Sequence, residues 1–85
     1  MISVDYEVAC QTIGQLIARQ AELIAEEESR AEPDQESLAE ATAARAALVV
    51  ERDTLMPDDA LGVMRVLTTY GPIASQLNGQ NRRNR

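Results

Sequence analysis

The stretch Tyr6–Ile24, with the sequence YEVACQTIGQLIARQAELI, decides how this 85-residue chain folds. Its apolar and small residues recur at spacings of three and four, which places them along one face of a helix. Ser3 is a candidate N-cap, and Asp5 and Glu7 put negative charge in the first turn, where the helix dipole favours it. The pattern predicts a helix over residues 4–29, about 40 Å long at 1.5 Å per residue. A rod of this length needs an equally long partner to cover its apolar face.

The next segment supplies a partner of similar length. Pro33 and Asp34 are typical of a helix start, because proline is tolerated in the first turn and a carboxylate suits the positive end of the dipole. From Ser37 to Leu55 there is neither Gly nor Pro, and six alanines raise the intrinsic helicity. We therefore expect a second helix over residues 34–55. With a turn at residues 30–33, the two helices form a long antiparallel hairpin.

A third helix is expected after the hairpin. Pro57 followed by two acids predicts a helix over residues 58–70, and Gly71 is a suitable terminating residue. Pro72 is expected to begin a last short helix over residues 72–77. Residues 78–85 are rich in Asn and Arg, and we expect them to form a disordered basic tail after a single helical domain that spans residues 1–77.

The composition excludes several classes of chemistry. The chain has a net charge of −6, no His, one Cys and only Arg among its basic residues. These absences remove imidazole and thiolate metal sites, Ser-His-Asp catalysis, Schiff-base chemistry and an intrachain disulfide. We expect neither enzymatic activity nor a metal or other cofactor. The chain also offers no signal peptide and no stretch of roughly 20 apolar residues, so we expect a cytoplasmic protein that does not enter a membrane.

Three features have both a chemical and a structural interpretation. The run Glu26–Glu28 can attract a cation or a basic partner, but it is also typical of a solvated helix end with a Glu26–Arg30 pair. Asp58 and Asp59 resemble an acid–base pair, but a helix start explains them more simply. Cys10 lies on the apolar face and has no neighbour that would activate a thiolate, so we expect a packing role.

Residues 60–77 resemble the first half of a bacterial helix-turn-helix. An apolar helix is followed by Gly71-Pro72 and then by a short segment with small and apolar positions. The resemblance implies DNA binding, although only six residues follow Asn78-Gly79, where the recognition helix should stand. Arg82, Arg83 and Arg85 are the candidate nucleic-acid contacts, and they predict weak binding that depends strongly on salt.

The apolar surface of the hairpin is wider than one narrow seam between two helices requires. Val8, Ile17, Ile24, Val49 and Val50 lie beside or beyond that seam, and such width usually means that another helix packs there. The third helix can fold back over the surface, and a second copy of the chain can also pack there; the two are compatible. We predict an all-α protein that completes a four-helix bundle as a homodimer. The candidate packing and dimer interface comprises Tyr6, Cys10, Ile13, Leu16, Ile17, Ile24, Leu38, Ala41, Leu48 and Leu55.

Two functional hypotheses follow from these patterns. The first is a small non-catalytic interaction module, an adaptor, regulator or inhibitor that dimerises and binds an unknown protein partner. The alternative is a DNA-associated accessory protein or transcriptional regulator that uses the partial helix-turn-helix and the arginine-rich tail.

Overall fold

The computed structural model describes the backbone of residues 4–83 and the side chains of residues 4–79. Helix α1 spans Val4–Glu28, α2 spans Gln35–Thr54 and α3 spans Ala60–Arg83. All regular structure in this described part of the chain is helical, so the all-α prediction is confirmed. The bounds of α1 and α2 differ by at most one residue from those that the sequence predicts.

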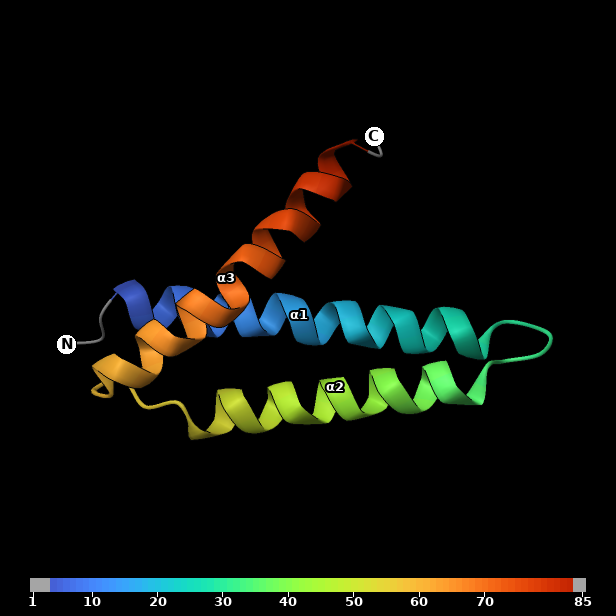
Figure 1. Ribbon diagram of the computed structural model, residues 1–85, viewed down its shortest axis with the longest axis horizontal. Helices are drawn as coiled ribbons and strands as arrows, with labels where there is room; N and C mark the ends of the chain where they lie inside the picture. Colours follow the sequence, from blue (N-terminus) through green and yellow to red (C-terminus); the bar gives the residue numbers. More distant parts are fainter. Residues whose placement is uncertain (1–3, 84–85) are drawn as a thin grey trace.

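Helices α1 and α2 lie side by side and antiparallel over most of their length (Figure 1). The turn between them is short, because Asp34 is already the N-cap of α2. The Asp34 carboxylate accepts hydrogen bonds from the backbone N–H groups of Glu36, at 3.0 Å, and of Ser37, at 3.5 Å. These contacts satisfy two of the N–H groups that the first turn of a helix otherwise leaves unpaired. The predicted hairpin is therefore present.

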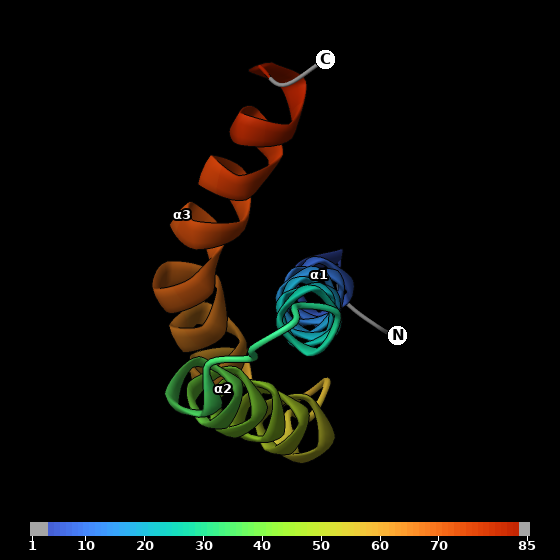
Figure 2. The ribbon, with the colours of Figure 1, turned by 90° about the vertical axis from the view of Figure 1, so that its right-hand side faces the viewer.

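Helix α3 crosses α1 near the N-terminal end of α1, and the C-terminal half of α3 then points away from the hairpin (Figures 1 and 2). Its backbone packs against α1, whereas no comparable packing joins α3 to α2 within the described residues. The chain measures 49 × 30 × 17 Å and has a radius of gyration of 14.6 Å. A compact chain of this length has a radius of gyration of about 12 Å. The projecting half of α3 makes the molecule open rather than compact.

The core lies where all three helices meet. Ile13 of α1 and Val66 of α3 are fully buried there. We call this part of the hairpin, Tyr6–Leu16 with Leu48–Leu55, the three-helix end, and the remainder, Ile17–Glu28 with Gln35–Ala47, the open end. The buried cluster comprises Ala9, Ile13, Leu16, Leu48, Leu55, Val63, Val66 and Ala74. Apart from Ala41, every buried apolar residue in the described part of the chain belongs to this cluster.

The start of α3 differs from the prediction. The helix begins at Ala60 rather than at residue 58, and Pro57 lies in a turn closed by the N–H of Asp59, which donates to the carbonyl oxygen of Met56 at 3.1 Å. The Asp59 carboxylate accepts a hydrogen bond from the N–H of Gly62 at 3.0 Å, which is the contact of an N-cap. Proline therefore shapes the turn, and Asp59 starts the helix.

The predicted break at Gly71-Pro72 is wrong. Helix α3 continues through both residues to Arg83, so the separate helix over residues 72–77 does not exist and residues 78–83 are helical rather than disordered. Proline disfavours a helical residue before it mainly through a clash with that residue's Cβ, which Gly71 lacks. Thr68 and Pro72 are exposed, so water can hydrate the carbonyl group that the missing N–H leaves free. The remainder of the predicted tail, residues 84–85, lies outside the described residues.

Candidate interaction surfaces

Half of the predicted interface residues belong to the core of a single chain. Ile13, Leu16, Ala41, Leu48 and Leu55 are each less than 9% exposed. Most of them pack in the cluster that α3 closes, so the third helix covers the seam over the three-helix end. These five side chains pack within one chain, although Leu16 and Ala41 also line grooves at its surface.

The other five predicted residues are half-buried, and the four that belong to α1 form a strip beside the seam. Tyr6, Cys10, Ile17 and Ile24 fall within about 40° of one another around α1 at 100° per residue, and Leu38 of α2 is also half-buried. We call the four α1 residues the side strip. A side-chain hydrogen bond with Cys10 raises the pKa of the Tyr6 hydroxyl, because it stabilises the protonated phenol. The side strip is therefore an apolar surface that one chain covers only in part.

Several large apolar side chains are exposed outside the side strip. Val8 and Val50, which the sequence places beyond the seam, are 42% and 61% exposed. Met56, Leu61 and Met64 form a second exposed group around the start of α3. Single exposed apolar residues are common in soluble proteins, so they become informative only where they line a groove.

A groove lies at the open end; among the large exposed apolar side chains of the described residues, Ile73 lines it. One part of it, about 440 Å³, lies between α1 and α2. A second part, about 230 Å³, lies between α1 and the projecting half of α3. Gln20 lines both parts, so they adjoin each other. We call the two together the open groove; its main apolar lining comprises Leu16, Leu23, Ala41, Ala44, Ile73 and Leu77.

A polar contact between side chains joins α3 to α2. The Arg65 guanidinium donates to both carboxylate oxygens of Glu51 on α2, at 3.2 and 2.6 Å. This bidentate contact lowers the pKa of Glu51, and a hydrogen bond with Tyr70 lowers it further. The same contact raises the pKa of Arg65. The contact joins α3 to α2, whose backbones do not pack together within the described residues.

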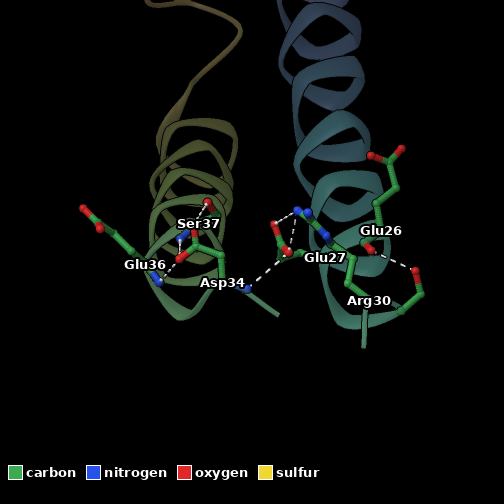
Figure 3. Close-up of polar contacts among 7 residues, drawn as sticks. Glu26, Glu27, Arg30, Asp34, Glu36 and Ser37 are labelled. Carbon is green, nitrogen blue, oxygen red and sulfur yellow. Dashed lines mark hydrogen bonds and ion pairs between the residues drawn. The ribbon is translucent and has the colours of Figure 1, made fainter. Parts of the chain in front are cut away.

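The acidic run at the end of α1 has a structural role in the hairpin turn (Figure 3). Glu27, whose side chain is only 13% exposed, pairs with Arg30 at 3.2 Å and accepts a hydrogen bond from the N–H of Asp34 at 3.2 Å. The expected Glu26–Arg30 pair is therefore replaced by Glu27–Arg30, and Glu26 lies 3.8 Å from Arg19 instead. The Ser37 hydroxyl, which donates to Asp34 at 2.9 Å, is the main reason that the pKa of Asp34 is lowered. The carboxylates of Glu27 and Asp34 therefore hold the turn in place.

The acidic residues that the sequence suggests as chemical sites do not come together in one site in the described part of the chain. Asp59 serves as a helix cap, as described above. Within the described residues, no group of three His, Cys, Asp or Glu side chains is arranged to hold a metal ion. The same part of the chain contains no helix that is long and apolar enough to cross a membrane.

The resemblance to a helix-turn-helix does not extend to the structure. That motif requires a turn between two helices, and residues 60–83 form one helix without a turn. Of the candidate nucleic-acid contacts, Arg82 and Arg83 stand in the last turn of α3, and Arg85 lies outside the described residues.

Comparisons with protein-family models, with curated proteins and with solved structures found no match to this chain. The functional interpretation therefore depends on the surfaces described above.

Proposed function

We propose that this protein is a small non-catalytic interaction module that works as a homodimer and binds a protein partner as an adaptor, regulator or inhibitor. The observation that carries the proposal is the open groove, where apolar side chains from three helices line a space that one chain does not fill. Helical proteins usually cover such surfaces with a further helix, and a second copy supplies it in a C2 dimer. The added helix completes a four-helix bundle at the open end.

The composition supports a non-catalytic role in a reducing compartment. The chain lacks the His and Lys side chains on which most acid–base and nucleophilic mechanisms depend. Its one cysteine makes no disulfide within the chain. We therefore propose the cytoplasm as its location, since disulfides are rare there.

Sedimentation velocity at micromolar concentration tests the dimer. The chain has a mass of 9.3 kDa, and we expect a species of twice that mass. A single species at the monomer mass over this concentration range would contradict the proposal.

The side strip is the surface that we assign to the protein partner. Ile17→Glu places a charge on the strip, whereas Gln11→Glu places the same charge on an exposed position of the same helix. In affinity captures from the native host, we expect the Ile17 variant to lose a protein that the wild type and the Gln11 variant both retain. Equal recovery of all proteins by the three baits would exclude the side strip as the partner surface.

DNA binding remains a second candidate, favoured by the three arginines at the C-terminal end. These residues predict phosphate contacts without sequence specificity. An electrophoretic shift with generic duplex at low salt, lost when residues 82–85 are deleted, would support this function. Absence of a shift at about 50 mM salt would exclude it.

A further inference from the structure

The apolar stripe of α3 continues beyond the part that α1 covers. Val63, Val66, Tyr70, Ile73 and Leu77 follow one another at spacings of three and four, which is the pattern of a helix that packs along one side. The first two are buried against α1, but Ile73 is 50% exposed although it lies on the same stripe. Ile73 and Leu77 face Leu16 and Gln20 of α1 across part of the open groove, so their own hairpin covers them only in part.

The projecting half of α3 and the uncovered part of the hairpin match in length. From Ile73 to Arg83 the helix rises by about 15 Å, and from Gln20 to Glu28 α1 rises by about 12 Å. The floor of the open groove contains Ala41 and Ala44, whose small side chains allow a second helix to approach closely. Helix α3 can therefore lie along this groove with Leu77 directed toward the alanines.

The charges of the two segments are complementary. Residues 17–47 contain eight acids and three arginines, whereas residues 73–85 contain three arginines and no acid. Glu27 and Glu40 line the open groove itself. An α3 helix that points its C-terminal end toward the hairpin turn brings its arginines close to this acidic segment. Charge complementarity of this kind fixes the direction of a docked helix more than it adds affinity.

The exposed area is large enough for such an interface. The chain exposes 6195 Å², whereas a compact monomer of this mass exposes roughly 5,000 Å². Stable interfaces bury about 600–1,000 Å² on each partner. The excess area of the open chain is therefore similar to the area that one side of a stable dimer buries.

We propose that the C-terminal half of α3, Ile73–Arg83, from a second copy of this chain occupies the open groove, and that the two copies do so reciprocally. This inference rests on the proposed homodimer and names the surfaces that form it. Each open end then contains α1, α2, its own α3 and the α3 of the partner copy. The arrangement covers Ile73 and Leu77 of both chains and leaves the side strip free.

Disulfide cross-linking between single-cysteine chains tests this contact. In a Cys10→Ser background, one preparation carries Ala44→Cys and a second, differently tagged one carries Leu77→Cys. The two are unfolded, mixed, refolded and oxidised, so a disulfide between Cys side chains at positions 44 and 77 can form only between chains. We expect a mixed dimer that reductant removes.

A matched control replaces Ala44→Cys by Val50→Cys. Position 50 lies on α2 about 120° around the helix from position 44, and Val50 is 61% exposed. We expect at least tenfold less mixed disulfide from this pair. Equal yields from positions 44 and 50 would overturn the inference. A chain that carries both Ala44→Cys and Leu77→Cys and closes only on itself would also overturn it, because α3 would then fill its own groove.

Charge substitutions separate this inference from the proposed dimer. Ile73→Asp with Leu77→Asp should preserve the helical circular dichroism and weaken dimerisation at least tenfold, whereas Leu61→Asp, at a position that is 85% exposed, should leave the dimer intact. If the wild type is a dimer and the double variant dimerises equally well, this inference fails and the proposed homodimer stands. If the wild type is a monomer, both fail.

Discussion

At the three-helix end, Ile13 and Val66 are completely enclosed, whereas at the open end only Ala41 is buried and Leu23, Ile24 and Leu38 stay half-exposed. The same two helices form both ends, so the difference comes from α3, which covers one end and leaves the other. The open end and the hairpin turn together, residues 17–47, also carry eight of the 14 acids of the chain. The comparison shows that one end is stabilised by packing among three helices, whereas the other leaves its apolar side chains only partly covered, which is why we propose that it contacts another molecule.

Removal of a core side chain at the three-helix end should have the largest effect. Ile13→Ala leaves a cavity in a fully buried site, and we expect the free energy of unfolding to fall by about 2–5 kcal/mol. Urea denaturation followed by circular dichroism measures this loss. The matched change at an exposed position, Leu61→Ala, should alter stability by no more than about 0.5 kcal/mol. Equal losses at the two sites would mean that the core is wrongly placed.

The features that the sequence predicts well are those set by local chemistry. The three-four spacing in α1 determines its buried face, and Pro33-Asp34 determines where α2 begins. The continuation of α3 through Gly71-Pro72 could not be predicted from the usual meaning of that pair, because it depends on how a glycine without Cβ accommodates the following proline. The hydrogen bond between Glu27 and Asp34 could not be predicted either, because only the turn brings these two residues close together. The exposed stripe at Ile73 and Leu77 becomes visible only once the direction of α3 is known.

Glycines inside the helices offer a sharper test of the α3 geometry. A Cβ added at Gly79, near the end of α3, meets no non-neighbouring atom within 4 Å, so Gly79→Ala should raise the free energy of unfolding by up to about 1 kcal/mol. A Cβ added at Gly62 would collide with the Asp59 carboxylate, so Gly62→Ala should displace this cap and lower stability by about 1 kcal/mol. Thermal unfolding of the two variants measures both effects. A destabilising Gly79→Ala would contradict a helix that continues to Arg83.

The smallest expected effect concerns the Glu51–Arg65 contact. The folded state lowers the pKa of Glu51 below its usual value. This carboxylate therefore stabilises the fold at pH values above its usual pKa, and the stabilisation is lost as the pH falls through the lowered pKa. Glu51→Gln should reduce stability at pH 7 by no more than about 1 kcal/mol, the range of partly exposed ion pairs. Urea titrations between pH 7 and pH 3 should show a shallower acid loss in the variant. If the stability of the variant depended on pH in the same way as that of the wild type, the Glu51–Arg65 pair would not hold α3.

Hydrogen–deuterium exchange at two protein concentrations, one below and one above the dissociation constant of the dimer, tests the difference between the two ends most directly. Association that completes the open end should slow exchange at the higher concentration for amides of Ile73–Arg83 and of Gln20–Glu28. Amides of Ala9–Leu16, which are protected by packing within one chain, should exchange at the same rate at both concentrations. Exchange at the open end that does not depend on concentration while the protein dimerises would contradict the account.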